Sequence, residues 1–399
     1  MTDPKAESCI REMKIGMRRI IAVLLAIACV VSMSACSGNT AAQDRTGNTE
    51  DSDIKKLKIV TTIFPEYDWV REILGTEADK ADVTILMDHG VDLHSYQPTA
   101  EDIATITACD LFIYVGGESD GWVEDALAES VNDDMHVINL LEVLGEKVKE
   151  EEVVEGMQGE EEEEEEEEEG PEYDEHVWLS LKNTEIFVQE IADAICDLDA
   201  ESQEVYSRNA DAYIEALSSL DRQYADAVDQ SAKHTILFGD RFPFRYLTDD
   251  YGLTYYAAFV GCSAETEASF ETIVFLANKV DEENLDYVLT IDGSDGKIAE
   301  TIIQNTEKKD QQVLKLNAMQ SITSSDIEQG STYLSIMEEN LEAAVNTCYE
   351  LAKPGDAVLL SPACASWGQF DNYEQRGNLF KEYVRNNFFE YNIIQESFK

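Results

Sequence analysis

The sequence predicts an α/β protein built on parallel sheets. Short apolar, β-branched runs alternate with helical patterns between residues 57 and 140, and a second series of such runs lies between residues 235 and 316. The segment between the two series, residues 183–233, is nearly free of Gly and Pro and has helical periodicity. Because alternating strands and helices are typical of parallel sheets with helical crossovers, these three observations favour this fold class.

The first series begins with Leu-Lys-Ile-Val-Thr-Thr-Ile at residues 57–63, and helical patterns follow at 67–74 and 100–108. Its later strand-like runs are 83–87, 111–115 and 136–140. In the middle segment, isoleucines at 186, 191 and 195 and later apolar residues up to Tyr224 keep helical spacing. The second series of predicted strands comprises 235–238, 254–259, 287–291 and 313–316.

The N-terminus reads as an export signal, residues 1–36. Arg18 and Arg19 precede an apolar run at 20–31 that is too short to span a bilayer, and small residues then lead to Cys36. This resembles a bacterial lipobox and predicts a lipid anchor at Cys36 on the bacterial cell membrane, outside the cytoplasm. The alternative is an ordinary secretory signal with an incidental cysteine. Residues 37–56 have the polar composition of a tether.

Acidic residues dominate the composition, with 83 Asp and Glu against 29 Lys and Arg. This balance argues against nucleic acid as a partner, because phosphates attract clusters of Lys and Arg. An acidic loop at 145–172 includes ten consecutive glutamates, residues 160–169, a run that repels itself and cannot bury apolar surface. Weak cation capture and a solvated insertion both stay open for this loop.

Five cysteines follow the leader, and none of them has a second cysteine close by in the sequence. They form neither a CxxC metal motif nor a disulfide framework, so we predict that most are small buried hydrophobic residues. These cysteines are residues 109, 196, 262, 348 and 364.

Two of the five histidines lie in segments rich in carboxylates and aromatics. His94 lies in Val-Asp-Leu-His-Ser-Tyr-Gln-Pro-Thr at 91–99, and His176 lies in Asp-Glu-His-Val-Trp-Leu-Ser at 174–180. Neutral imidazole is the commonest protein ligand for zinc-like ions, and a flanking carboxylate can orient it. The two segments therefore predict a metal site that uses both histidines.

These motifs resemble those of the zinc- and manganese-binding lipoproteins that feed ABC importers, and the resemblance covers about residues 57–342. It implies two similar parallel-sheet lobes, 57–182 and 234–342, joined by a long rigid helix at 183–233, with a metal cleft between the lobes. It also implies a monomeric receptor that captures Zn²⁺, or alternatively Mn²⁺, for an ABC importer permease. On this interpretation the chain is not an enzyme.

The second lobe departs from the family pattern, which supplies His or Glu and then Asp or Glu as third and fourth ligands. The third position falls on Arg241, whose guanidinium stays protonated and cannot bind a metal. The fourth falls near residues 316–320, which offer amides and no carboxylate. We therefore predict Asp240 as the third ligand. Further candidates around the site are Arg241, Asp68, Asp292 and Asn317.

Several interpretations of this departure stay open. The favoured one has Asp240 bind the metal while Arg241 pairs with a neighbouring acid. Alternatively, Arg241 binds an anionic or chelated-metal cargo, the metal site of a hybrid chain is degenerate, or Asp240 and Arg241 form a structural ion pair. An enzyme is the rival from another class, since such groups can activate water, but the sequence displays no set of nucleophile, base and oxyanion donors.

The tail, residues 343–399, resembles the C-terminal end of the ligase that adds D-glutamate to UDP-N-acetylmuramoyl-alanine. The resemblance matches Ser366 and Phe370 to residues that hold the amino-acid substrate of that ligase. The Gly-Lys-Ser/Thr phosphate loop and the central domain of the ligase are absent. We therefore predict no ligase activity, and a true fusion, a recombined gene and a frame or assembly artefact stay open.

Overall fold

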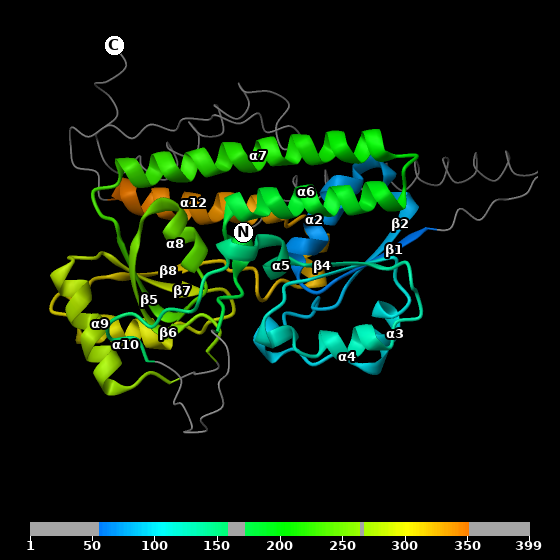
Figure 1. Cartoon of the computed structure of the whole chain (residues 1–399). Helices are drawn as coiled ribbons and strands as arrows, with labels where there is room; N and C mark the ends of the chain where they lie inside the picture. Colours follow the sequence, from blue (N-terminus) through cyan, green and yellow to red (C-terminus); the bar gives the residue numbers. More distant parts are fainter. Residues whose placement is uncertain (1–55, 159–171, 264–266, 351–399) are drawn as a thin grey trace, which may run out of the picture. The chain divides into compact units, whose positions relative to one another are not determined.

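The computed structural model describes residues 56–158, 172–263 and 267–350. Within them the chain forms two four-stranded parallel sheets (Figure 1), which confirms the predicted α/β class. The leader with Cys36, nearly all of the tether, the ten-glutamate run and the tail from residue 351 lie outside the described residues. No helix in the described segments is long and apolar enough to cross a membrane.

The first sheet has the strand order β2-β1-β3-β4. Parallel pairing sets Ile59 opposite both Val83 and Leu111, so apolar residues fill the centre of the sheet. Its strands β1 Leu57–Thr61, β2 Ala81–Ile85, β3 Leu111–Tyr114 and β4 His136–Asn139 overlap the predicted strands, and α2 Phe64–Leu74 and α3 Ala100–Ile106 overlap the predicted helices. The short helices α4 Val123–Ala128 and α5 Leu140–Leu144 were not predicted.

The second sheet has the same kind of order, β6-β5-β7-β8, and its strands also overlap the predicted runs. The pairing of β5 with β6 shifts register between Phe238 and Arg241, so the ladder is irregular at Gly239 and Asp240. Its elements are β5 Thr235–Phe242, α8 Arg245–Tyr251, β6 Thr254–Val260, α9 Phe270–Glu282, β7 Tyr287–Ile291, α10 Lys297–Asn305, β8 Gln312–Leu316, α11 Ser324–Glu328 and α12 Tyr333–Glu350.

The linker expected as one helix over 183–233 consists of two helices, α6 (Leu181–Leu198) and α7 (Gln203–Gln230). The break needs no Gly or Pro, because the Asp199 carboxylate accepts hydrogen bonds from Ser202 Oγ at 2.7 Å and Tyr206 Oη at 2.8 Å. These bonds stabilise a turn in place of a continuous helix.

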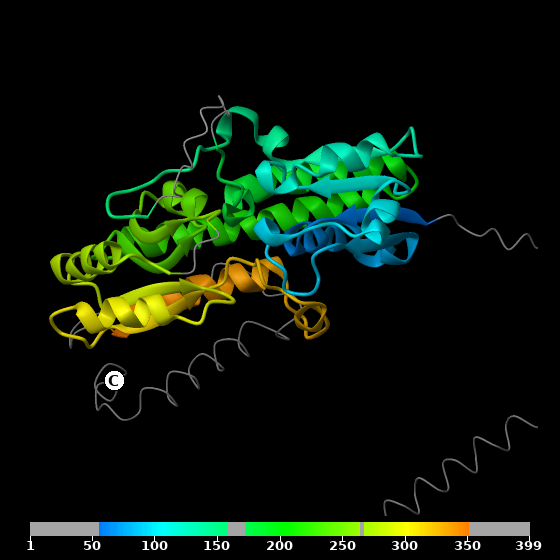
Figure 2. The ribbon, with the colours of Figure 1, turned by 90° about the horizontal axis from the view of Figure 1, so that it is seen from below.

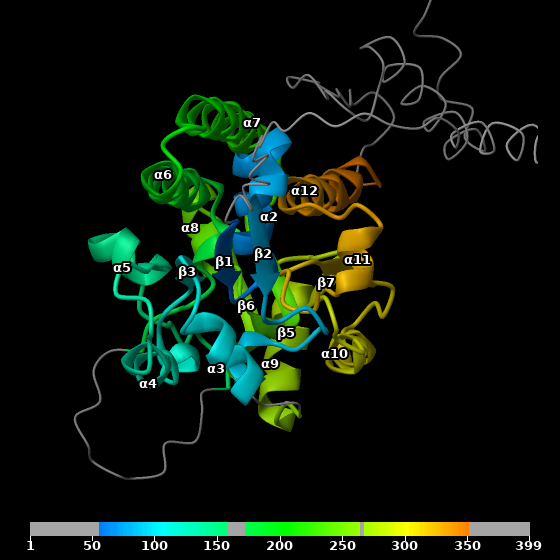
Figure 3. The ribbon, with the colours of Figure 1, turned by 90° about the vertical axis from the view of Figure 1, so that its right-hand side faces the viewer.

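Helix α7 contacts both lobes along its length. Asn209 donates a hydrogen bond to the backbone of Ile73 in α2 at 2.9 Å, whereas Asp221 accepts one from Tyr251 in α8 at 3.0 Å. In two views, α2, α6, α7 and α12 gather on one side of the sheets while α3, α4, α9 and α10 lie on the other (Figures 1 and 3). Viewed from below, the elements of the two sheets occupy opposite ends of this arrangement (Figure 2).

A buried aromatic cluster ties the first lobe to these helices. Trp69 in α2 is fully buried, and its ring lies 5.7 Å from that of Phe187 in α6 and 5.4 Å from that of Tyr333 in α12. Large rings packed in this way contribute much of the stability of a core. This cluster therefore packs α2 of the first lobe tightly against α6 and α12.

Candidate metal centre

His94 lies in the short helix η2 (Leu93–Ser95), in the loop after β2. The Asp92 carboxylate accepts a hydrogen bond from the His94 backbone N–H at 3.0 Å. The ring nitrogen Nδ1 of His94 lies 2.9 Å from Ser119 Oγ and 3.4 Å from Glu175 Oε2. Because these partners engage Nδ1, the other nitrogen, Nε2, is left to donate its electron pair.

His176 lies fully buried just before the short helix η5 (Val177–Leu179). Asp174 Oδ1 accepts hydrogen bonds from both the backbone N–H of His176, at 2.9 Å, and its ring Nδ1, at 3.0 Å. An Nδ1–H that donates to a carboxylate fixes the tautomer in which Nε2 carries the lone pair. Both histidines therefore turn the same nitrogen toward the site.

Glu175 strengthens this arrangement from the side of His94. Burial would raise its pKa, but hydrogen bonds from His94 and Ser119 hold the pKa of this carboxyl below its ordinary value. An ionised Glu175, with Oε2 3.4 Å from Nδ1 of His94, raises the basicity of the ring through its charge.

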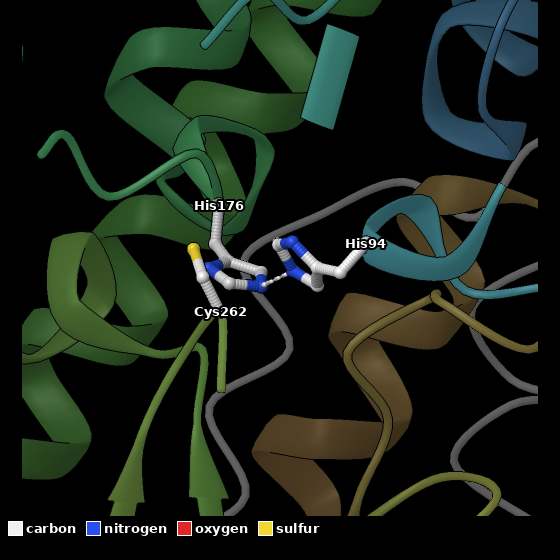
Figure 4. Close-up of side chains that lie close together, drawn as sticks. All are labelled: His94, His176 and Cys262. Atoms are coloured by element: carbon white, nitrogen blue, oxygen red, sulfur yellow. Dashed lines mark hydrogen bonds between the residues drawn. The ribbon is translucent and has the colours of Figure 1, made fainter. Parts of the chain in front are cut away.

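The Nε2 atoms of His94 and His176 lie 3.1 Å apart (Figure 4). Two lone pairs that face each other at this distance repel, so a proton or a cation between them stabilises the pair. Two nitrogens bound to one tetrahedral zinc ion at about 2.0–2.1 Å would be about 3.3–3.4 Å apart. The imidazoles therefore need only a small shift to bind one ion.

Gln320 brings an amide to the same point from the second lobe. Its Nε2 lies 3.0 Å from Nε2 of His176, and its Oε1 is buried without a hydrogen-bond partner. Asp292 holds the loop through the backbone N–H of Ala318 at 2.6 Å, and the Trp178 indole donates to the carbonyl of Ala318 at 2.9 Å. Because the two ends of an amide are assigned from their surroundings, a half-turn of the Gln320 amide directs Oε1 at the site.

Cys262 is a third candidate donor, and the sequence did not predict it. Among the described residues, one group of three His, Cys, Asp or Glu side chains has its donor atoms within 4.8 Å of one another: His94, His176 and Cys262 (Figure 4). Burial, followed by the nearby Glu151, raises the pKa of the Cys262 thiol far above its usual range. The available signal was its place just after β6, because ligands of parallel sheets bind beyond the carboxyl ends of the strands.

Arg241 pairs with a neighbouring acid, as the favoured interpretation expected. Its Nη2 lies 2.5 Å from Asp92 Oδ2, so the ion pair joins the second lobe to the first. Burial would raise the pKa of Asp92, but Arg241 holds it below the ordinary value. Because Asp92 already neutralises this guanidinium, the geometry argues against an anionic cargo bound by Arg241.

Asp240 is not part of the converging donor group. Its Oδ1 accepts a hydrogen bond from the Arg241 backbone N–H at 2.9 Å, and its Oδ2 is buried without a partner. Asp240 therefore stays a prediction as a ligand.

Of the two remaining candidates, Asn317 lies near the site and Asp68 does not. Asn317 accepts a hydrogen bond from the backbone N–H of Met319 at 2.8 Å, where φ is 62°. A bulky residue rarely adopts this conformation, so the strained turn is held in place just before Gln320. Asp68 lies elsewhere, in the helical base, where it accepts from the Tyr333 backbone N–H at 2.8 Å.

The chain is similar to several known proteins. The family described as zinc-uptake complex component A, periplasmic, matches residues 59–347. The chain is 31% identical over 331 residues to the zinc-binding lipoprotein AdcA of Streptococcus pneumoniae (strain ATCC BAA-255 / R6), covering 82% of this chain and 60% of that protein. It is 30% identical over 318 residues to the high-affinity zinc uptake system protein ZnuA of Bacillus subtilis (strain 168), covering 79% and 93% respectively.

Solved structures show the same fold. The Zn(II)-bound ZnuA-like domain of Streptococcus pneumoniae AdcA aligns with a TM-score of 0.57 at 29% identity, over 73% of this chain and 99% of that one. The metal-dependent lipoprotein YcdH of Bacillus subtilis aligns with a TM-score of 0.58 at 27% identity, over 72% and 97%. The chain spans about 60% of the length of the AdcA protein that it matches.

Proposed function

Because this chain belongs to the zinc-uptake complex component A family, we propose that it captures Zn²⁺ outside the cytoplasm and passes it to an ABC importer permease. The observation that carries the proposal is the pair of Nε2 atoms of His94 and His176, 3.1 Å apart. Each histidine has its Nδ1 within hydrogen-bonding reach of an oxygen partner, Ser119 Oγ beside His94 and Asp174 Oδ1 beside His176. These two side chains hold the ion, and the groups beside them orient the rings.

The placement of the donors also accounts for uptake and release. Both histidines belong to the first lobe, whereas Cys262 and Gln320 follow strands of the second lobe. An ion bound between them links the lobes, and separating the lobes removes donors from the ion and lowers its affinity. Imidazole and thiol donors suit zinc better than Mn²⁺, which favours carboxylate and water oxygens.

The anchor and the domain limits belong to the same proposal. Lipidation of Cys36 would hold the receptor at the bacterial cell membrane. The receptor would be a monomer with lobes at 57–182 and 234–342 and a linker at 183–233. A Cys36→Ala variant is expected to leave the membrane fraction and appear as a freely diffusing protein. Retention of the variant at the membrane would argue against this anchor.

We also propose that the ligase-like residues 343–399 take no part in zinc capture. The donors described above all precede residue 321. A chain that ends at about residue 345 is expected to match the full chain in zinc content and melting temperature. Aggregation of the shortened chain would show that the tail has become part of the receptor.

The proposal is tested by measuring the zinc content of the purified mature chain. The expected result is one Zn²⁺ per chain, lost in the His94→Ala/His176→Ala double variant. His89→Ala is the matched control, because the His89 side chain is largely exposed and lies outside the donor group. Full zinc content in the double variant, or none in the unaltered chain, would overturn the proposal.

A further inference from the structure

We infer that the second lobe completes the zinc site with the Cys262 thiolate and the Gln320 amide oxygen, which makes the site selective for thiophilic cations. The inference rests on the proposed zinc-binding function and names its remaining ligands. Soft thiolate ligands select zinc and related ions, whereas carboxylate and carbonyl oxygens suit Mg²⁺ and Mn²⁺. A Cys in this place would therefore discriminate against the hard cations that an acidic protein attracts.

The loop that carries Cys262 is fixed against His176. A Cβ added to Gly261 would lie 2.9 Å from Cε1 of His176, so this position must be glycine for the loop to approach the ring. The backbone N–H of Cys262 donates to Glu151 Oε1 at 3.0 Å. These contacts hold the thiol next to the imidazole (Figure 4).

The Gln320 side chain independently indicates that a metal ion binds beside His176. It is 9% exposed, yet its Oε1 has no hydrogen-bond partner, which is costly for a buried polar atom. Its Nε2 lies 3.0 Å from Nε2 of His176, which Nε2 of His94 also approaches at 3.1 Å. A cation between the rings relieves the repulsion of the two facing lone pairs and gives Oε1, after the amide turns, a partner.

The binding step balances as follows. A zinc–sulfur bond forms as the Cys262 S–H bond breaks, and the proton leaves to solvent. The two imidazoles bind as neutral ligands through their lone pairs. The bound ion and the thiolate together carry one net positive charge, which the buried carboxylates of Asp174 and Glu175 face from behind the rings.

X-ray absorption at the zinc edge on the zinc-loaded mature chain tests this inference. A sulfur neighbour is expected at about 2.3 Å beside nitrogen and oxygen neighbours at about 2.0–2.1 Å. The sulfur signal is expected to vanish in Cys262→Ser and to persist in Asp240→Asn. Cys196→Ser is the matched control, because Cys196 lies in α6 and outside the donor group.

Affinity gives a second readout. Cys262→Ser is expected to weaken zinc binding more than about 100-fold, since even residues that only orient a ligand contribute about 10–100-fold. The same substitution should leave Mn²⁺ binding nearly unchanged. If Cys262→Ser fails to fold, alkylation of the unaltered chain followed by mass spectrometry decides, because zinc should protect Cys262 from the reagent.

The outcomes separate the two proposals. A zinc-loaded chain without sulfur neighbours, a sulfur signal that survives in Cys262→Ser, or alkylation of Cys262 at the same rate with zinc would overturn this inference alone. Loss of the sulfur signal in Asp240→Asn would overturn it in favour of Asp240 as the organising ligand. Failure of the unaltered chain to bind zinc at all would instead overturn the proposed function.

Discussion

The two lobes contribute to the metal centre in different ways. In the first lobe, His94 and His176 both have polar partners at Nδ1, and aromatic rings pack α2 against α6. In the second lobe, the proposed donors Cys262 and Gln320 lie in loops after strands, and Arg241 lies at the position where the resemblance led us to expect the third ligand. On the proposed ligand set, the first lobe sets the geometry of binding while the second determines which ion is bound.

The contribution of the α2–α12 contact to stability can be tested through Asp68, which accepts a hydrogen bond from the Tyr333 N–H. Burial raises the pKa of Asp68 to about 7. The negative charge of Glu72 also raises this pKa, whereas the Tyr333 N–H and Arg71 lower it. The unfolded chain keeps a value near 3.8, so the folded state binds more protons between about pH 4 and pH 7. The stability due to protonated Asp68 is therefore present below pH 4 and lost as the pH rises through 7.

Asp68→Asn should remove this dependence, because Asn stays neutral and still accepts from the Tyr333 N–H. The difference in unfolding free energy between the variant and the unaltered chain should change by at most about 4 kcal/mol between pH 4 and pH 8. Urea unfolding at several pH values measures it. A constant difference across this range would show that Asp68 does not titrate in the folded chain.

Asp174, which orients His176 in the first lobe, should contribute more to zinc affinity than Asp240 of the second lobe. Asp174→Asn is expected to lower zinc affinity about 10–100-fold, because the Nδ1–H of His176 loses its charged acceptor. Asp240→Asn should leave the affinity little changed. Competition with a chelator of known affinity measures both. The reverse order would assign the third ligand to Asp240 and overturn the division between the lobes.

The ion pair between Arg241 and Asp92 should have a smaller effect. Both side chains keep about a fifth of their surface exposed, 20% and 21%, so Arg241→Gln is expected to cost about 1 kcal/mol of unfolding free energy. The cost should shrink at high salt, and zinc stoichiometry should be unchanged. Arg222→Gln, on the exposed surface of α7, is the control. Loss of zinc in Arg241→Gln would show that this residue organises the site directly.

Removal of the ten glutamates at 160–169 should have the smallest effect. The deletion spares Glu151 and Gln158, which contact the second lobe through Cys262 and Ala258. Melting temperature and the affinity of the high-affinity site are expected to stay the same. Titration with zinc before and after deletion also tests weak capture, since additional low-affinity binding should disappear with the run if the glutamates bind cations.

The sequence predicted the strands and the pairing of His94 with His176 because both leave local patterns. Apolar runs marked the strands, and short motifs placed His94 and His176 beside their acids. The break between α6 and α7 escaped prediction because the Asp199 side chain makes it without Gly or Pro. Cys262 escaped because an isolated cysteine carries no local pattern, and only the folded second sheet brings it to His176.

We propose that His94 and His176 bind one zinc ion through Nε2. Crystals of the zinc-loaded chain, measured by anomalous diffraction at the zinc edge, would show where the ion binds. One strong peak is expected between the two rings, about 2.0–2.1 Å from each Nε2 atom. A zinc peak bound elsewhere, with no density between these rings, would contradict it.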